Sequence, residues 1–287
     1  MDPAARIIDV GYGGKQRAVG AWLVQDTLID CGSQACIQTL LAGLGDARPH
    51  RLLLTHIHFD HAGAAGALAA RWPDLEIWVH PLGARHLVDP TRLVDSARRV
   101  FGARFEMLVG DVVPVPQANI HLLEDGAQIG DFASAWTPGH ARHHVAFLDR
   151  RSGVCYPGDV AGVALAPGVV IPPTPPPDID LVAWRASLER ITAWDPTAFA
   201  LPHFGAIEDA PAHLRLIADA LDRHEAWARE GTEIFERELA AWLGERLPPE
   251  VAGDYSFVAL GAPSAEGLVR WLERSAQAEG SEREPTT

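Results

Sequence analysis

Side chains that bind metal ions or move protons are concentrated in one short segment of the chain. It reads His56-Ile57-His58-Phe59-Asp60-His61 and places three imidazoles and one carboxylate within six positions. Burying such a group without a cation to neutralise it carries a large desolvation penalty, so the segment indicates a metal site rather than a packing role. In an extended loop His56 and His58 would share one face and could bind the same ion. Asp60 and His61, beyond the turn, could then bind a second ion beside it.

The stretches before the candidate ligands predict how the fold positions them. The cluster follows the apolar run 51–54, which we interpret as a buried strand whose carboxyl end carries the loop, as in open α/β sheets. Three more candidates each follow a strand-like stretch and a turn: His140 after 132–136, Asp159 after 153–156 and His203 after 198–201. The repeated order of strand, turn and ligand predicts that strand ends from two sheets converge on one place.

These residues, in this order and spacing, resemble the signature of a known family. The segment 56–61 matches the His-x-His-x-Asp-His motif of the metallo-β-lactamase superfamily, and segment 28–32 is similar to an early Asp-x-Gly element of that fold. The residues that carry the resemblance are Asp30, His56, His58, Asp60, His61, His140, Asp159 and His203. It spans about residues 7 to 205. The resemblance implies an α/β fold of the α+β type, a four-layer αββα sandwich.

The resemblance also implies a role for each of these residues. The first metal ion would be bound by His56, His58 and His140, and the second by Asp60, His61 and His203. Asp159 would bridge the two ions together with a hydroxide, and Asp30 would fix a ligand histidine or a loop through hydrogen bonds. Nitrogen and oxygen ligands of this kind favour two divalent zinc ions, with iron or manganese as alternatives.

Such a site points to hydrolysis. Two cations a few ångström apart lower the pKa of a bridging water to about 7 and so produce a hydroxide nucleophile at neutral pH. The hydroxide would attack a carbonyl, with Asp60 orienting it and accepting its proton. We therefore expect a metal-dependent hydrolase and favour a thioesterase or related ester hydrolase, similar to glyoxalase II, that acts on a small molecule.

His143 and His144 lie in a segment with its own resemblance. The run 139–144 reads Gly-His-Ala-Arg-His-His, which is similar to the Gly-His-x-x-Gly-His of glyoxalase II-like hydrolases, with His143 in place of glycine. The second histidine of that motif lies near the metal ions without binding them, so we expect His144 to support the site or to contact substrate. The alternative is a histidine that starts a strand and packs beneath the loop.

Other activities of the family fit the sequence less well. A mononuclear iron oxygenase similar to persulfide dioxygenases is the main alternative and would bind its metal through His56, His140 and Asp159 alone. A lactonase would be expected to carry tyrosine shortly after Asp159, where residues 160–162 read Val-Ala-Gly. A nuclease is disfavoured because the net charge is −14 and no basic stripe for phosphates is visible, so no nucleic-acid partner is expected.

The distribution of apolar segments predicts one main domain with a helical extension. With 287 residues, 47% of them hydrophobic, the chain can bury a large core. We assign 1–208 to the sandwich domain, 209–276 to C-terminal helices that could pair two chains as a homodimer, and 277–287 to a disordered tail. Residues 81–105 should form a helix that could overhang the site as a lid. The proline-rich stretch 166–178 should be an extended loop outside any sheet, and it could wall the pocket.

The cysteine content and the amino-terminal sequence bear on the compartment. Three cysteines do not make a disulfide framework, and the first residues carry no apolar signal region. No run reaches the ~20 apolar residues of a membrane-spanning helix. We therefore expect a cytoplasmic protein without a membrane partner.

Overall fold

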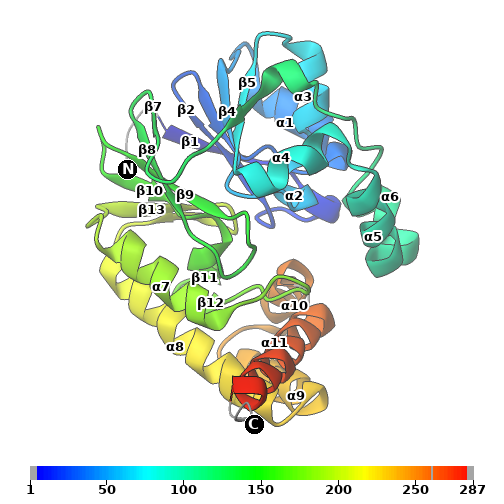
Figure 1. Cartoon of the computed structure of the whole chain (residues 1–287), viewed down its shortest axis with the longest axis vertical. Helices are drawn as coiled ribbons and strands as arrows, with labels where there is room; N and C mark the ends of the chain where they lie inside the picture. Colours follow the sequence, from blue (N-terminus) through cyan, green and yellow to red (C-terminus); the bar gives the residue numbers. More distant parts are fainter. Residues whose placement is uncertain (1–4, 260, 283–287) are drawn as a thin grey trace.

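The computed structural model describes residues 5–259 and 261–282, and its strands form two facing sheets and a separate hairpin (Figure 1). The strands are β1 Ala5–Asp9, β2 Gly20–Val24, β3 Thr27–Ile29, β4 Arg51–Leu53, β5 Glu76–Val79, β6 Ile120–Leu122, β7 Gln128–Ile129, β8 Phe132–Trp136, β9 Val145–Asp149, β10 Val154–Tyr156, β11 Val163–Ala166, β12 Val169–Ile171, β13 Ala198–Leu201 and β14 Gly205–Ile207. The first sheet has the order β1-β2-β3-β4-β5-β6, the second has the order β14-β13-β10-β9-β8-β7, and β11 pairs with β12.

Helices cover the outer face of each sheet. The α-helices are α1 Ile37–Leu44, α2 Phe59–Ala62, α3 Ala65–Arg71, α4 Pro81–Val88, α5 Thr91–Phe101, α6 Phe105–Leu108, α7 Leu181–Thr192, α8 Ala210–Arg229, α9 Thr232–Gly244, α10 Pro249–Val258 and α11 Gly261–Glu282. The short 3-10 helices are η1 Tyr12–Gly14, η2 Gln34–Cys36, η3 Gly102–Arg104, η4 Gln117–Asn119 and η5 Gly158–Ala161. Helices α1, α3 and α4 lie on the side of the first sheet, and α7 and α8 lie beneath the second (Figure 1).

The central strands are buried on both faces, and their residues alternate between two cores. In β10, Val154 and Tyr156 belong to the core between the sheets, while Cys155 belongs to the core beneath the helices. In β9, Phe147 belongs to the core between the sheets and Ala146 to the core beneath the helices. A strand with apolar side chains on both faces must be covered on both, by the other sheet and by helices. The expected four-layer αββα sandwich is therefore confirmed.

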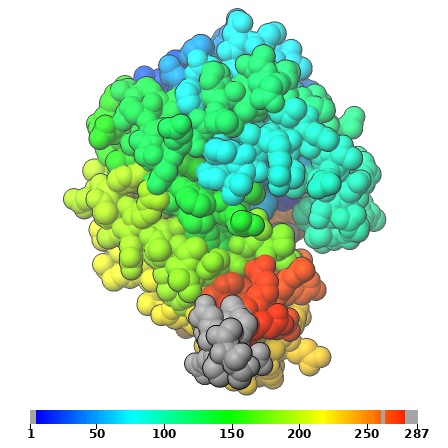
Figure 2. Space-filling view, in the orientation of Figure 1, coloured from blue at the N-terminus to red at the C-terminus, as the bar shows by residue number. Residues whose placement is uncertain are grey.

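The C-terminal helices α8 to α11 continue this core rather than forming a separate one. Ile217 and Leu221 of α8 pack in the same buried cluster as residues of β2, β4 and β13. Asp209 starts α8 as its N-cap, because its carboxylate accepts a hydrogen bond from Ala212 N at 2.8 Å. The start of α8 lies beside the expected boundary at 208/209, but the division into two units stays a prediction. The surface is hollowed between α5–α6 and α10–α11 (Figure 2).

Two expectations about local structure are wrong. Residues 81–105 do not form one helix, because α4 ends before Asp89, which is extended and precedes Pro90, where a helical conformation is disfavoured. The stretch 166–178 is not wholly outside sheets, because β12 pairs with β11. Pro167 and Gly168, the latter with φ +73°, turn the chain between those two strands, and the run of five prolines begins only after β12.

The end of the chain also differs from expectation. Helix α11 continues to Glu282, past residue 277, where the disordered tail was expected to begin. Alanine, glutamate and glutamine in this stretch favour helix. Residues 283–287 of the expected tail lie outside the described residues. None of the helices in the described part of the chain combines the length and apolarity needed to cross a bilayer.

Candidate metal centre

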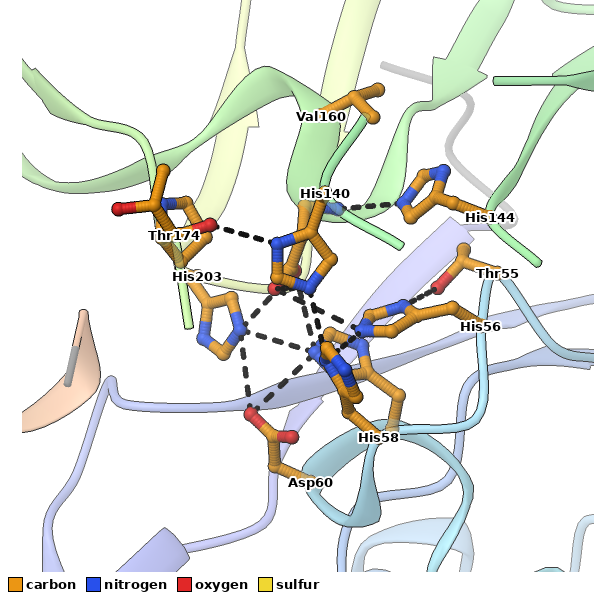
Figure 3. A network of polar contacts seen from close by, with 12 residues as sticks. Thr55, His56, His58, Asp60, His140, His144, Val160, Thr174 and His203 are labelled. Atoms are coloured by element: carbon orange, nitrogen blue, oxygen red, sulfur yellow. Dashed lines mark hydrogen bonds and ion pairs between the residues drawn. The ribbon is translucent and has the colours of Figure 1, made fainter. Parts of the chain in front are cut away.

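The seven predicted ligands lie together where loops leave the carboxyl ends of β4, β8, β10 and β13 (Figure 3). Ligand atoms within 4.8 Å of one another form three groups: His56, His58 and His140; His56, His61 and Asp159; and Asp60, His61 and His203. The first and the last of these sets are the two ligand sets expected from the sequence, and we call them the first group and the second group. The remaining set joins the two through Asp159.

In the first group, ring nitrogens point at one another. His58 Nδ1 lies 3.0 Å from His56 Nε2 and 2.9 Å from His140 Nε2. Two nitrogens bound to one tetrahedral zinc at about 2.05 Å would lie about 3.3 Å apart. The spacing in the first group is slightly shorter than this, so the three nitrogens fit around one cation.

In the second group, the two imidazoles of His61 and His203 and the carboxylate of Asp60 converge. His61 Nε2 lies 3.2 Å from His203 Nε2, and Asp60 Oδ2 lies 3.5 Å from the former and 3.7 Å from the latter. Both histidines are buried, whereas the Asp60 side chain is 24% exposed. Asp60 is therefore the carboxylate of this group that solvent or a substrate can reach.

Asp159 lies between the two groups and presents one carboxylate oxygen to each. Its Oδ2 lies 3.3 Å from His140 Nε2 and 3.9 Å from His56 Nε2. Its Oδ1 lies 3.3 Å from both His61 Nε2 and His203 Nε2, and it is buried without a hydrogen-bond partner among the residues that the structure describes. A buried carboxylate oxygen with no donor calls for another partner, and a cation in the second group would supply one.

In four of the five ligand histidines, a hydrogen bond fixes which ring nitrogen carries the proton. His140 Nδ1 donates to the Pro173 carbonyl at 2.8 Å, and His203 Nδ1 donates to the Ala18 carbonyl at 2.7 Å, since a carbonyl only accepts. In both rings Nε2 is therefore the nitrogen with the free lone pair. This second layer of contacts orients histidines toward a metal.

Asp30 and Thr55 fix the rings of His61 and His56 in the same way. Asp30 Oδ2 accepts from His61 Nδ1 at 2.9 Å, and Asp30 Oδ1 accepts from Thr55 N at 2.8 Å. The Thr55 hydroxyl donates to Asp30 Oδ2 at 2.8 Å and lies 3.0 Å from His56 Nδ1, from which it can accept. Asp30 is thus placed behind the ligands, as expected. Thr55 was not predicted, although its position one residue before His56 was a usable signal.

His144 and His143 occupy different positions. His144 is fully buried, with Nδ1 2.9 Å from Thr137 Oγ1 and Nε2 accepting from Asp159 N at 3.1 Å. Both of its nitrogens are engaged, so it holds the backbone of the loop that carries Asp159, which fits the supporting role rather than substrate contact. His143 stacks on His56 with ring centroids 6.3 Å apart and belongs to none of the three groups.

Burial and neighbouring charges shift the pKa values of the two groups of histidines in opposite directions. Burial lowers the pKa of His56, His58 and His140, which keeps the first group neutral. Burial also acts to lower the pKa of His61, but Asp159, Asp60 and Asp30 outweigh it and raise that pKa to about 10. Without a cation the second group therefore holds protons, which metal binding would release.

The pKa of Asp159 moves in the opposite direction. Burial alone would raise it, yet His61, His203 and His140 hold it well below its usual value. The neighbouring histidines therefore favour the carboxylate form of Asp159. A set of neutral imidazoles together with the carboxylates of Asp60 and Asp159 is one that zinc, iron and manganese can bind.

Comparison with known proteins gives matches over most of the chain. A sequence model described as "Metallo-beta-lactamase superfamily" matches residues 17–203. The metallo-beta-lactamase fold-containing protein ST1585 of Sulfurisphaera tokodaii is 30% identical over 163 residues, which cover 54% of this chain and 60% of that protein. A hydroxyacylglutathione hydrolase of Xanthomonas euvesicatoria pv. vesicatoria is 30% identical over 140 residues, which cover 49% of this chain and 43% of that protein. The chain therefore spans about half the length of these curated relatives.

Solved structures extend the likeness in fold. A crystal structure of ST1585, described there as an archaeal metallo-beta-lactamase superfamily protein from Sulfolobus tokodaii, matches with a TM-score of 0.71 and 22% identity over 92% of this chain and 98% of that one. A structure of TTHA1623 in a di-iron-bound form matches with a TM-score of 0.52 and 27% identity over 77% of this chain and 96% of that one.

Proposed function

The chain belongs to the metallo-beta-lactamase superfamily, and we propose that within it the protein is a dinuclear-metal hydrolase of thioesters or esters. The observation that carries the proposal is the position of Asp159, whose two carboxylate oxygens face two separate groups of histidines. A site for one cation would need only one of those groups. The complete second group, with its buried and unpartnered Asp159 Oδ1, supports two.

Each residue would have a defined part. The first cation would be held by His56, His58 and His140, the second by Asp60, His61 and His203, and Asp159 would contact both. Two such cations supply an activated water near neutral pH and a Lewis acid for a carbonyl oxygen. Zinc is favoured by the donor set, with iron or manganese as alternatives.

The protein groups around this site have their own tasks. Asp60, the partly exposed carboxylate, would orient the attacking water and accept its proton. Asp30 and Thr55 would keep the protons of His61 and His56 on Nδ1, away from the cations. His144 would hold Asp159 in place through its backbone N–H.

Thioesters and esters are favoured as substrates for two reasons. A relative matched over part of its length is named as a hydroxyacylglutathione hydrolase. In addition, residues 160–162 after Asp159 read Val-Ala-Gly, so the tyrosine expected shortly after this residue in a lactonase is missing there. A small-molecule substrate fits the net charge of −14, which disfavours nucleic acid.

The test is a substrate panel run on metal-loaded and metal-depleted protein. Thioesters, oxygen esters and lactones that share one acyl group would separate the leaving-group preference from the acyl preference. We expect thioester or ester turnover that disappears with the metal and returns when zinc is added. Turnover that is indifferent to metal would refute the proposal, and oxygen uptake with a persulfide by a one-iron protein would replace it with the oxygenase.

We propose the cytoplasm as the compartment. The support is that Cys31, Cys36 and Cys155 are all buried and free, as is usual for thiols in a reducing environment. Fractionation of the native host, with antibodies against the protein, would test this.

A further inference from the structure

The proline-rich loop 172–180 contacts the loop of His140 at both of its ends. Near its start, the Pro173 carbonyl accepts the Nδ1–H of His140 at 2.8 Å. At its end, Asp180 N donates to the Gly139 carbonyl at 2.9 Å. In Figure 3 this loop, marked by Thr174, lies beside His140 on the side away from His58. The orientation of one candidate ligand therefore depends on where this loop lies.

The loop has little means of fixing its own position. Residues 172–177 read Pro-Pro-Thr-Pro-Pro-Pro, and proline has no N–H to donate. Thr174 therefore supplies the one backbone donor within these six residues. That donor does not bond within the loop; it bonds to Ser264 Oγ of α11 at 3.1 Å.

Helix α11 holds the loop at further points. The Thr174 hydroxyl donates to the Ser264 carbonyl at 2.9 Å, and both residues are buried. Arg274, nearly three turns further along α11, donates to the Pro177 and Ile179 carbonyls at 3.1 Å each. The helix thus contacts the loop at its beginning and near its end.

Gly267 lets the helix approach this closely. A Cβ atom at position 267 would overlap the Thr174 carbonyl oxygen and would lie 3.0 Å from Pro175 C and Pro176 N. All of these are backbone atoms, which cannot rotate away as the end of a side chain can. A side chain at 267 would therefore displace the loop that carries the Pro173 carbonyl.

We propose that α11 is a positioning element for the first metal group, in which Ser264 and Gly267 hold Thr174 and Thr174 holds the Pro173 carbonyl against His140. The inference rests on the proposed function, because it assigns the orientation of His140 a role in metal affinity. It gives the C-terminal helices a task at the site that they do not reach directly. The second group should not respond, because its histidines are fixed by Asp30 and Ala18 instead.

The test uses two pairs of variants in the full chain. Thr174→Val removes the hydroxyl donor and keeps the shape, while Thr174→Ser restores the donor. Gly267→Ala places a Cβ against the loop, while Gly253→Ala makes the same change in α10, where nothing lies within 4 Å of the new atom. Stepwise zinc affinities would be measured by competition with a chromophoric chelator, and the His140 Nδ1–H resonance would be followed by proton NMR.

We expect Thr174→Val and Gly267→Ala to weaken one of the two zinc equivalents about tenfold, at the lower end of the loss seen when a group that orients a metal-binding histidine is removed. The affinity of the other equivalent should change less than about twofold. Thr174→Ser and Gly253→Ala should match the wild type. The His140 resonance should shift or broaden in Thr174→Val and Gly267→Ala only. Equal weakening of both equivalents, or no change in either, would overturn the inference. A wild-type protein that binds no second ion would instead contradict the proposed function, while the His140 resonance would still report whether α11 orients that ring.

Discussion

Asp30→Asn is the substitution whose effect on the metal centre follows most directly from the hydrogen bonds. The Asp30 carboxylate accepts from Thr55 N and Thr55 Oγ1 and from His61 Nδ1. Asparagine has the same shape but only one acceptor oxygen. If that oxygen keeps the Thr55 N–H, the amide NH₂ faces the Nδ1–H of His61, and two donors oppose each other.

His61 can relieve this clash only by moving its proton from Nδ1 to Nε2. The Nε2 atom then loses the lone pair that it presents toward His203 and Asp159. Loss of a group that sets the tautomer of a metal-binding histidine typically weakens metal binding by about 10- to 100-fold. We therefore expect the second zinc equivalent to weaken by that factor, about 1.4–2.7 kcal/mol, while the first equivalent changes less than about twofold.

The assay is a zinc titration of metal-free protein against a competing chelator, with the melting temperature measured in parallel. Asp26→Asn is the matched control, because the Asp26 side chain is 55% exposed and, among the described residues, its polar contacts are with Arg51 and its neighbour Thr27. Unchanged affinity for both ions in Asp30→Asn would refute the reasoning about the tautomer. A loss shared by both ions together with a lower melting temperature would show that Asp30 supports the fold rather than His61.

Three further outcomes are expected. Asp159→Ala removes ligand atoms from both groups, so metal content and turnover should fall together, whereas His143→Ala should keep its metal; elemental analysis and kinetics decide this, and an Asp159→Ala protein with full metal and turnover would contradict the site. Burial chiefly lowers the pKa of His224 to about 3, and neither ring nitrogen has a hydrogen-bond partner in the described part of the chain. The unfolded chain takes up a proton at His224 below about pH 6.5 while the folded chain excludes it, so this contribution to stability is complete above that pH and is lost as the pH falls toward 3. Between pH 7 and pH 5, the free energy of unfolding measured in urea should therefore fall by about 2 kcal/mol less in His224→Leu than in the wild type. An equal fall in both proteins would rule out the burial argument. Removing metal with a chelator should lower the melting temperature, since an ion at 100 times its Kd contributes about 2.7 kcal/mol; calorimetric curves that coincide with and without metal would contradict a folded-state metal site.

The ligand positions could be predicted because the fold repeats one local arrangement. Asp159 and His203 each follow a short apolar strand that is buried on both faces, and His140 follows the partly buried β8, so the sequence carries both the strand and the turn after it. The spacing within 56–61 adds a pattern that packing alone seldom produces. Their convergence follows because β8, β10 and β13 run in the same direction, so their carboxyl ends lie at the same edge of the second sheet.

The partners of those ligands could not be predicted in the same way. His140 and His203 are oriented by the carbonyls of Pro173 and Ala18, and a backbone carbonyl is common to every residue type. Only the three-dimensional path of the chain brings these two carbonyls to the site. Thr55 is different, because its side chain and its place beside His56 were visible in the sequence.

The prediction of helices from the sequence was limited because tertiary contacts also decide where a helix forms and ends. Local propensity alone does not mark helix α10, because Gly253 and the aromatic and β-branched residues around it are weak helix formers. The burial of Tyr255 against the hairpin of β11 and β12 supplies the missing stability. Pairing of two chains through the C-terminal helices stays a prediction.

The central claim is that two cations lie between Asp159 and its two groups of histidines. The most direct measurement is the metal content of untagged protein, expressed without added metal and purified without chelator, determined by elemental analysis. We predict about two divalent ions per chain, zinc or a mixed pair. One iron per chain, unchanged when Asp60 or His203 is substituted, would contradict the two-metal centre.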